Sequence, residues 1–315
     1  GTPSLMQPAT IEAVLNKIRT IWPVSNDFEV SLEANPSSFE IRKFKGFKSA
    51  GINRVSIGVQ ALNDNDLKLL GRLHTENEAR RAVEEALRLF DRVSADFIYA
   101  RQHQSFNSCD SELREALQLG LDHLSLYQLT IEPNTAFGAR HARNKLPGLP
   151  SDDVGAELYE LTQERCSAAG YSAYEVSNHA KEGAEARHNL IYWRYGDYLG
   201  IGPGAHGRIT LDGARHATET KLQPKAWLQD VVETKTGEKL RYRLSGLEQS
   251  QELMLMGLRL AEGVDLKRFS ALSGSDLSET QKSELVQMGL LMQRGDLLFT
   301  TAKGRPLLNA ILEKL

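Results

Sequence analysis

The chain has 315 residues, of which 41% are hydrophobic and 25% are charged, an ordinary composition for a globular protein with a sizeable core. Its net charge of −3 gives no reason to expect nucleic acid or an anionic membrane surface as the partner, and no apolar run approaches the length of a membrane span. The two cysteines, Cys109 and Cys166, lie far apart and form no metal-type pair, so we expect a reducing, cytoplasmic setting.

Short apolar runs alternate with amphipathic segments from the N-terminus to about residue 207. Strands are predicted at residues 28–36, 54–60, 95–100, 123–131, 173–178 and 198–202. Helices are predicted between them at residues 39–51, 65–73, 76–90, 111–120 and 155–170. This order predicts parallel βαβ units wound right-handed. The periodicity alone leaves open whether the strands form a barrel or an open doubly wound sheet.

The pattern changes at about residue 208, so we predict one domain over residues 1–207 and a second over residues 208–315. In the second region several helices precede two apolar runs around an RGD turn at residues 294–296, which indicate a β-hairpin, and a last helix follows. Helices followed by a hairpin resemble a winged-helix module. Residues 265–315 carry seven Lys or Arg against six Asp or Glu, so they offer no footprint for phosphates, and we expect a packing or lid domain.

Polar side chains recur near the ends of the predicted strands. They are Glu33 on the first strand, Gln60 on the second, Arg72 twelve residues further, Asp96 on the third and Thr130 on the fourth. Ligands of parallel α/β folds bind at the carboxyl ends of the strands. We therefore expect these groups to converge on one site at that end of the sheet, which we call its mouth. Carboxylates, a carboxamide and a guanidinium suit a zwitterionic ligand that bears hydroxyl groups. Each one alone is more often a surface or capping group, so their recurrence carries the prediction.

Residues 202–207 read GPGAHG and formally match the dinucleotide fingerprint. That fingerprint should open a helix, whereas RITLDG follows here, which is typical of a strand or loop. We therefore reject a nucleotide-binding Rossmann interpretation. We expect these glycines to let the backbone approach a ligand or to form a tight, barrel-closing turn.

Residues 187–200, RHNLIYWRYGDYLG, combine His188 with a dense set of aromatic side chains. Imidazole is a common iron ligand, and flat aromatic rings line pockets for large planar ligands. In the alternative interpretation, His188 and Asn189 hydrogen-bond loops together while Tyr192 and Trp193 fill the core. Composition alone favours this alternative.

The segments GTPSL, EANP, GVQ, LGR-H, EVSNHA, RHNLIYW and YLGIGPGAHG follow one another along the chain. In this order they resemble the radical S-adenosylmethionine (SAM) proteins related to oxygen-independent coproporphyrinogen oxidase, and among these the heme-chaperone branch, HemW. The resemblance covers effectively the whole chain. It implies an α/β fold, namely an incomplete parallel (β/α) barrel of the radical SAM type with the first strand absent, followed by a small winged-helix-like domain.

The resemblance also implies roles for particular residues. Contacts to SAM are implied at Gly1, Thr2, Glu33, Gln60, Arg72, Asp96 and, more weakly, Thr130. A heme contact is implied at His188, the imidazole of the HNxxYW signature. The family holds a [4Fe–4S] cluster with a CxxxCxxC loop upstream of GTPS. We expect its ligands to lie outside this chain, because Cys109 and Cys166 do not form such a loop, and no metal ligand or catalytic residue is assigned.

One loop departs from the family pattern. After the third strand the family usually has LPGQT or a similar run, whereas this chain has RQHQSF at residues 101–106. The loss of Pro-Gly changes the backbone freedom of a loop at the mouth. We expect His103 to be an exposed loop histidine and not a new ligand.

Three functions are compatible with these residues. The leading hypothesis is a heme-chaperone-like protein that binds heme and SAM and passes heme to respiratory-chain proteins, with peripheral membrane association through those acceptors; whether it is an enzyme stays open. The first alternative is an oxygen-independent coproporphyrinogen III oxidase, which decarboxylates two propionates in heme biosynthesis. The second is a cluster-free binding protein. The sheet edge left by the absent first strand is expected to favour self-association, as in a homodimer.

Overall fold

The computed structural model describes residues 2–133 and 135–315. The chain forms two compact units, Gly1–Glu185 and Ala186–Leu315. The predicted division after residue 207 falls within a strand of the second unit, β7 (His206–Leu211). Residues 186–207 belong with the second unit because α9 (Arg187–Trp193) packs against the helix α11 (Gly246–Gly257) of that unit.

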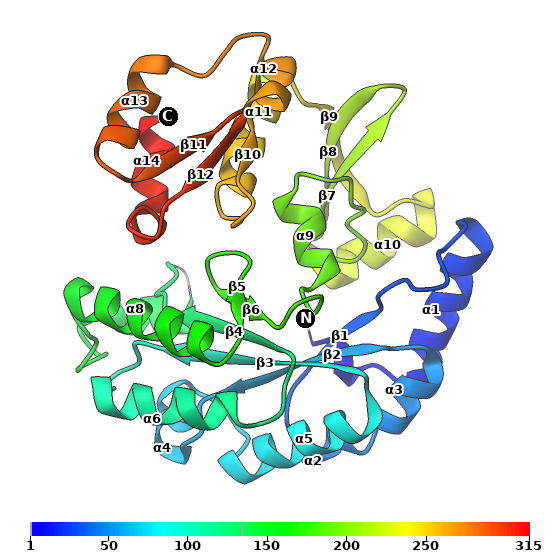
Figure 1. The fold of residues 1–315 in the computed structure, drawn as a ribbon. Helices are drawn as coiled ribbons and strands as arrows, with labels where there is room; N and C mark the ends of the chain where they lie inside the picture. Colours follow the sequence, from blue (N-terminus) through cyan, green and yellow to red (C-terminus); the bar gives the residue numbers. More distant parts are fainter. Residues whose placement is uncertain (1, 134) are drawn as a thin grey trace. The chain divides into compact units, whose positions relative to one another are not determined.

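The first unit is a single six-stranded sheet with the strand order β1-β2-β3-β4-β6-β5 (Figure 1). Its strands are β1 (Ser31–Ala34), β2 (Arg54–Gln60), β3 (Arg92–Tyr99), β4 (His123–Gln128), β5 (Ser172–Ala173) and β6 (Asn178–Ala180). Its helices are η1 (Pro3–Leu5), α1 (Pro8–Ile21), α2 (Ser38–Ile41), α3 (Phe44–Ala50), α4 (Asp64–Leu69), α5 (Glu76–Leu89), α6 (Phe106–Leu117), α7 (Ala136–His141) and α8 (Asp152–Ala168). Strands β1 to β4 pair in parallel with helices between them, which confirms the predicted α/β class.

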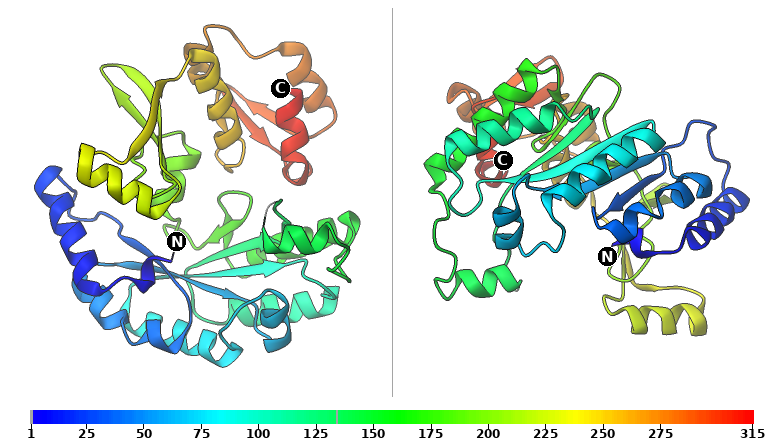
Figure 2. Two further views of the ribbon diagram at one scale, coloured as in Figure 1. Left: turned by 180° about the vertical axis from the view of Figure 1, so that it is seen from behind. Right: turned by 90° about the horizontal axis from the view of Figure 1, so that it is seen from below.

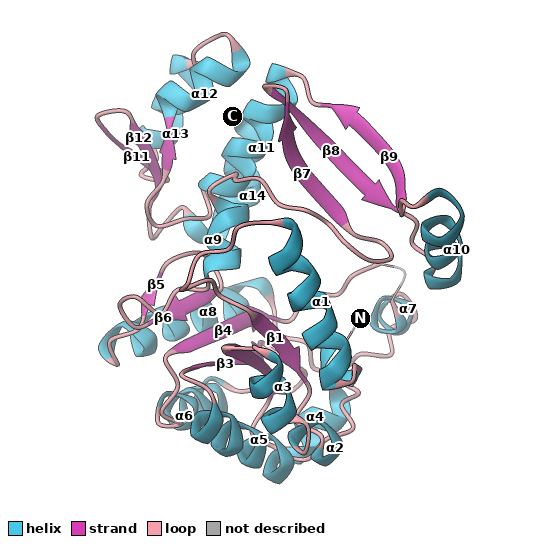
Figure 3. Ribbon diagram, turned by 90° about the vertical axis from the view of Figure 1, so that its right-hand side faces the viewer, coloured by secondary structure: helices cyan, strands magenta, loops and turns pink. Residues whose placement is uncertain are grey.

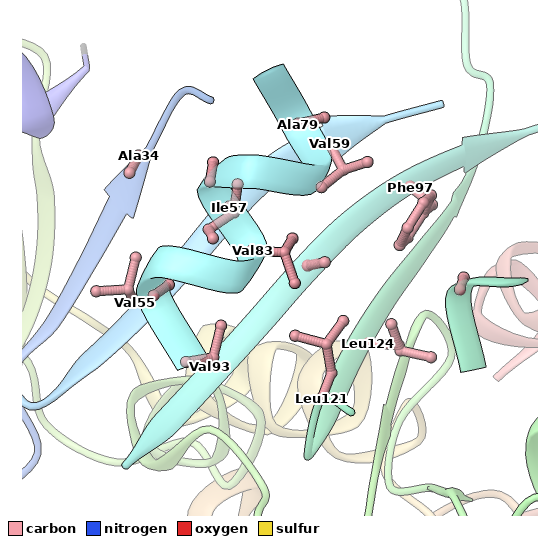
Figure 4. Close-up of a cluster of buried hydrophobic side chains, with 14 of the residues drawn as sticks. Ala34, Val55, Ile57, Val59, Ala79, Val83, Val93, Phe97, Leu121 and Leu124 are labelled. Carbon is pink, nitrogen blue, oxygen red and sulfur yellow. The ribbon is translucent and has the colours of Figure 1, made fainter. Parts of the chain in front are cut away.

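One face of this sheet carries the hydrophobic core. Figures 1 and 2 show α3, α5 and α6 along the same side of the parallel strands. Alternate strand residues point to that side because side chains of a strand alternate between its two faces. The buried strand residues there are Leu32, Ala34, Val55, Ile57, Val59, Val93, Ala95, Phe97, Leu124 and Leu126. Figure 4 shows several of them beside Ala79 and Val83 of α5. The opposite face of the sheet is therefore left for polar residues.

Two predicted elements of the first unit differ in the structure. The predicted helix 39–51 is two helices, α2 and α3, separated at Arg42 and Lys43. The predicted strand 173–178 is two short strands, β5 and β6, that pair with each other, and β6 runs antiparallel to β4. The turn between β5 and β6 is held by Glu175, whose Oε1 accepts hydrogen bonds from the Ser177 backbone and the Asn178 amide.

The second unit contains two further sheets. Figure 3 shows β7, β8 (Ala214–Thr220) and β9 (Glu238–Arg243) as one antiparallel sheet, and α10 (Pro224–Thr234) connects β8 to β9. The sequence did not predict this sheet. The predicted strand 198–202 is absent: Tyr198 forms one isolated bridge with Arg208, and Gly202 has a φ of 111°. The GPGAHG segment leads into β7 and opens no helix, which agrees with the rejection of a Rossmann fingerprint.

The C-terminal part of the second unit has the element order of a winged helix. Helix α11 (Gly246–Gly257) is followed by β10 (Val264–Asp265), α12 (Leu266–Ser273), α13 (Glu279–Gln287), β11 (Leu291–Arg294) and β12 (Leu297–Thr300). The three strands form an antiparallel sheet in the order β10-β12-β11, and the predicted hairpin is β11–β12. The chain ends with η2 (Arg305–Leu307) and α14 (Leu308–Lys314). In the part of the chain that the structure describes, no helix has the length and apolarity needed to cross a bilayer.

Candidate functional site

The face of the first sheet opposite the helices is lined by polar side chains. In the pairing register, Glu33 of β1 lies beside Ser56 of β2, which lies beside Ser94 of β3 and then His123 of β4. A second row begins with Asp96 and continues to Ser125 and Asn178. Directly paired residues share a face of a sheet, so these two rows form one polar surface.

Asp96 lies in the middle of this surface. Its Oδ1 accepts a hydrogen bond of 3.0 Å from the Ser56 hydroxyl of the neighbouring strand. Burial raises the pKa of the Asp96 carboxyl, the hydrogen bonds from Ser125 and Ser56 oppose this rise, and the charge of Glu33 adds to it. Glu33 pairs in register with Ser56, whose hydroxyl donates to Asp96, so the two predicted carboxylates lie near each other on the same face.

Gln60 ends β2 with a φ of 70°, a left-handed conformation that is unusual for a residue other than glycine. Its side chain folds back over Gly58, because a Cβ built on Gly58 would lie 2.9 Å from Gln60 Nε2. A side chain at position 58 would therefore displace the carboxamide. Backbone strain of this kind is concentrated at functional sites, where the surrounding structure maintains it.

Arg72 follows α4 and is exposed, and its backbone N–H donates to the Leu67 carbonyl over 2.8 Å. Besides burial, the positive charge of Arg72 lowers the pKa of the nearby His74 ring. Nε2 of His74 donates a hydrogen bond of 3.1 Å to the carbonyl of Val59. Val59 directly precedes Gln60, so His74 links the segment that carries Arg72 to the end of β2.

His74 gives a prediction about pH. Burial lowers its pKa from 6.5, the hydrogen bond to Val59 opposes this fall, and the charge of Arg72 adds to it. A depressed pKa means that the folded state favours the neutral ring, so this contribution to stability is present above the unfolded pKa and is lost as the pH falls through the folded pKa. In His74→Gln the amide still donates to Val59 but does not titrate. We therefore expect its melting temperature to decline less than that of the unaltered chain between about pH 7 and 5; equal declines would contradict this role.

Of the two predicted N-terminal contacts to SAM, Gly1 and Thr2, the structure describes only Thr2, which lies beside β1. Gly1 lies outside the described residues, and Thr2 is the N-cap residue of η1, which packs against β1. This segment is fixed by Glu40, which is 2% exposed and accepts hydrogen bonds from the Ser4 hydroxyl and, over 2.8 Å, from the Asn35 backbone. The spacing of Ser37 and Glu40 is typical of a capping box, and it does not indicate the longer-range contacts of Glu40.

Removing the Glu40 carboxylate should destabilise the N-terminal segment. In Glu40→Ala the Ser4 hydroxyl and the Asn35 N–H lose their acceptor, and we expect the free energy of unfolding to fall by about 1–3 kcal/mol. Glu40→Gln keeps one acceptor oxygen and should lose less. Urea unfolding of both variants measures the difference, and an alanine variant as stable as the unaltered chain would contradict the contact.

Two other residues stand apart from the polar face. Thr130 lies beyond the end of β4, is exposed, and donates from its hydroxyl to the Gln128 carbonyl over 3.3 Å. His103 is also exposed, as expected, with a φ of 61°, and its backbone N–H donates to the Gly148 carbonyl over 2.7 Å.

The divergent loop at residues 101–106 begins with a buried arginine. Arg101 is 3% exposed and forms ion pairs with Asp66 of α4 at 2.7 Å and with Glu112 of α6 at 2.8 Å. The preceding residue, Ala100, has a φ of 56°. The sequence identified this loop as different, but the partners of Arg101 are distant along the chain and could not be found from spacing.

In the second unit, His188 lies in the first turn of α9 and is half-buried. None of the residues of α9 is fully buried, and Ile191 and Tyr192 are 45% and 39% exposed. The Tyr192 ring meets the edge of the Tyr198 ring at a centroid distance of 4.5 Å. The alternative interpretation that Tyr192 fills the core is therefore wrong, whereas Trp193 is half-buried with the Arg259 guanidinium 4.6 Å from its ring centroid. Helix α9 presents the exposed Ile191 and Tyr192 next to an imidazole.

The C-terminal end of α9 is fastened by arginines. Arg268 of α12 donates to the carbonyls of Arg194 and Tyr195 over 2.7 and 2.8 Å. Arg194 in turn makes a two-pronged ion pair with Glu262, at 2.7 and 2.8 Å. Cations near the last carbonyls of a helix stabilise it, so these contacts fix α9 within its unit.

The two cysteines are not placed to form a metal site. Cys109 lies in α6 and Cys166 in α8, both are buried, and neither forms a disulfide. Burial raises the pKa of each thiol to about 12, so both are protonated and unsuited to ligation. Across residues 2–133 and 135–315, no group of three His, Cys, Asp or Glu is placed to hold a metal ion.

Comparison with known proteins agrees with this architecture. A model of the radical SAM superfamily matches residues 1–124, and a model of the HemN C-terminal domain matches residues 244–307. The heme chaperone HemW of Escherichia coli (strain K12) is 37% identical over 318 residues, which span 99% of this chain and 81% of that protein. Radical S-adenosyl methionine domain-containing protein 1, mitochondrial, of Bos taurus is 38% identical, over 99% of this chain and 73% of that protein.

Among solved structures, coproporphyrinogen III oxidase (HemN) from Escherichia coli, described as a radical SAM enzyme, matches with a TM-score of 0.81. The match covers 100% of this chain and 75% of that chain at 21% sequence identity, which shows a common fold and no more. The sequence identity to the HemW relatives establishes the family. The chain belongs to the HemN/HemW group of the radical SAM superfamily.

Proposed function

We propose that this protein is a heme chaperone: it binds heme through α9 and SAM through the polar face of the first sheet, and it delivers heme to respiratory-chain proteins in the cytoplasm. The observation that carries the proposal is α9 itself, where His188 lies next to exposed apolar and aromatic side chains. The 37% identity to a protein described as a heme chaperone supports the same function.

The polar face fits a sulfonium nucleotide in its chemistry. Glu33 and Asp96 can accept hydrogen bonds from ribose hydroxyls and attract the sulfonium, Gln60 can both donate and accept, and the exposed guanidinium of Arg72 can pair with a carboxylate of the ligand. Gly1, Thr2 and Thr130 are proposed as further contacts on the family resemblance. Bound SAM supplies organic chemistry that side chains lack, while the residues named here bind and orient it.

A [4Fe–4S] cluster is implied by membership of the radical SAM family. The two buried, protonated thiols do not fit such a cluster, because three or four thiolates are needed and Cys109 and Cys166 lie on separate helices.

Heme binding suits α9 for a physical reason. A neutral imidazole ligates heme iron, and apolar and aromatic groups next to it cover a flat porphyrin and remove its surface from water. Ile191 and Tyr192 are both accessible enough to do this.

Association with a membrane is proposed only through the acceptor proteins. A homodimer is proposed because β1 is an edge strand of the described sheet, and an edge strand can pair with another chain.

Titration of the purified protein with hemin, followed by its Soret band, tests the heme site. We expect a saturable Soret shift that is lost or strongly altered in His188→Ala. His206→Ala is a matched control, since His206 lies in the same unit with an exposed side chain, and it should behave like the unaltered protein.

Two outcomes would contradict the heme proposal. One is the absence of a saturable shift, and the other is equal binding by the His188 and His206 variants. Anaerobic conversion of coproporphyrinogen III by the reconstituted protein would instead favour the oxidase of heme biosynthesis. The likeness to HemN at 21% identity does not favour that activity by itself.

A further inference from the structure

The buried arginine of the divergent loop makes an unusual set of contacts. The Arg101 side chain is 4% exposed, and those of its partners Asp66 and Glu112 are 18% and 13% exposed. Arg101 reaches Asp66 with both Nε, at 3.2 Å, and Nη2, at 2.7 Å, while Nη1 pairs with Glu112 and also donates to the carbonyl of Ile98. One guanidinium thus joins the end of β3 to helices α4 and α6.

These contacts hold the segment that leads from β2 to Arg72. Glu112 uses its second oxygen to accept a hydrogen bond of 2.7 Å from the backbone of Leu62, two residues after Gln60. Asp66 lies within α4, and the N–H of Arg72 donates to Leu67 at the next position of that helix. The segment is therefore tied at its start, through Glu112, and in its middle, through Asp66, to one buried guanidinium.

We propose that Arg101 is a positioning residue for the SAM site: it fixes α4 against the end of β3 and thereby holds the Arg72 guanidinium at the mouth of the sheet. The inference rests on the proposed function of that mouth. An arginine is needed because its planar fork donates in several directions at once, whereas a lysine would act as a point charge on one carboxylate.

The variant Arg101→Lys tests this role while keeping the buried positive charge. We expect faster hydrogen–deuterium exchange of backbone amides in residues 62–72 and an affinity for SAM about tenfold lower in equilibrium dialysis. Arg165→Lys is the matched control, because Arg165 also bridges two carboxylates, Asp110 and Glu164, but on the helices α6 and α8. The control should change neither measurement.

A double variant separates positioning from general structural damage. If Arg101 acts through Arg72, Arg101→Lys should weaken SAM binding by less than about twofold when Arg72 is already alanine, because the group that it positions is gone. An equal loss of affinity in both backgrounds, or unchanged amide exchange in residues 62–72, would overturn the proposal.

Failure of this inference is distinguishable from failure of the proposed function. If the unaltered protein does not bind SAM, the cofactor assignment fails and the functional part of the inference fails with it, whatever the exchange data show. If the unaltered protein binds SAM and Arg101→Lys binds it equally well, the assignment stands and the positioning role is refuted.

Discussion

Replacement of Arg101 by methionine is expected to lower the free energy of unfolding of the first unit by about 3–5 kcal/mol. Methionine leaves Asp66 and Glu112 as two largely buried carboxylates without a cation, and removing one partner of a buried ion pair exposes the full cost of burying the other. Urea unfolding, followed by a probe within the first unit, measures this loss.

Two further variants show whether the effect comes from unpaired charge. Arg80→Met removes a partly exposed arginine between the carboxylates of Glu76 and Glu115. It should lower the free energy of unfolding by less than about 1 kcal/mol. The triple variant Arg101→Met, Asp66→Asn, Glu112→Gln removes all three charges and should recover much of the lost stability. If Arg101→Met is as stable as Arg80→Met, the network does not stabilise the fold as we infer.

Replacement of Asp96 by asparagine is expected to stabilise the fold and to impair the site. Burial raises the pKa of Asp96, so its contribution to stability is present at low pH and is lost as the pH rises through the raised pKa. Burial of the charged carboxylate therefore disfavours folding as the pH rises, and asparagine, which can still accept from Ser56, removes that charge. We expect the variant to have a higher melting temperature than the unaltered chain at about pH 7, and this difference in melting temperature should narrow as the pH falls. SAM binding should be weaker by about tenfold.

Asp122→Asn provides the matched control for this variant. Burial also raises the pKa of Asp122, but this residue pairs with Arg92 at 3.2 Å and precedes β4, at the opposite end of the strands from the mouth. Losing that pair should not stabilise the fold, and SAM binding should be unchanged. A destabilised Asp96→Asn variant with normal SAM affinity would contradict the placement of Asp96 in the site.

The parallel part of the first sheet could be predicted because its strands have a clear chemical pattern. Strands that are covered by helices on one face alternate apolar and polar residues, as in RVSIGVQ, and the polar residues Ser56, Asp96 and Ser125 mark the other face. Glu33, Gln60 and Asp96 were predicted together because they lie near the ends of successive strands, and the carboxyl ends of parallel strands meet at one edge of a sheet. Arg72 was predicted as part of the same set. The hydrogen bond from His74 to Val59, which connects the segment of Arg72 to the end of β2, was not predicted.

The elements that were missed have no such pattern. Strand β9 carries apolar groups only at Leu240 and Tyr242, both of which are exposed, so no buried face marks it, and β5 and β6 are too short for a period to be recognised. The contacts of Arg101 with Asp66 and of Glu40 with Ser4 join residues 35 and 36 positions apart. Contacts of this kind depend on the tertiary fold, and a single sequence carries no signal for them.

We propose that the polar ends of consecutive strands form one site for a sulfonium nucleotide. Equilibrium dialysis of SAM against the unaltered protein and against Glu33→Ala, Gln60→Ala, Arg72→Ala and Asp96→Asn tests it most directly, with S-adenosylhomocysteine as the comparison ligand without the sulfonium charge. We predict a single class of site that prefers SAM and is weakened about tenfold or more by each substitution. Affinities unchanged in all four variants, or no binding by the unaltered protein, would contradict the account.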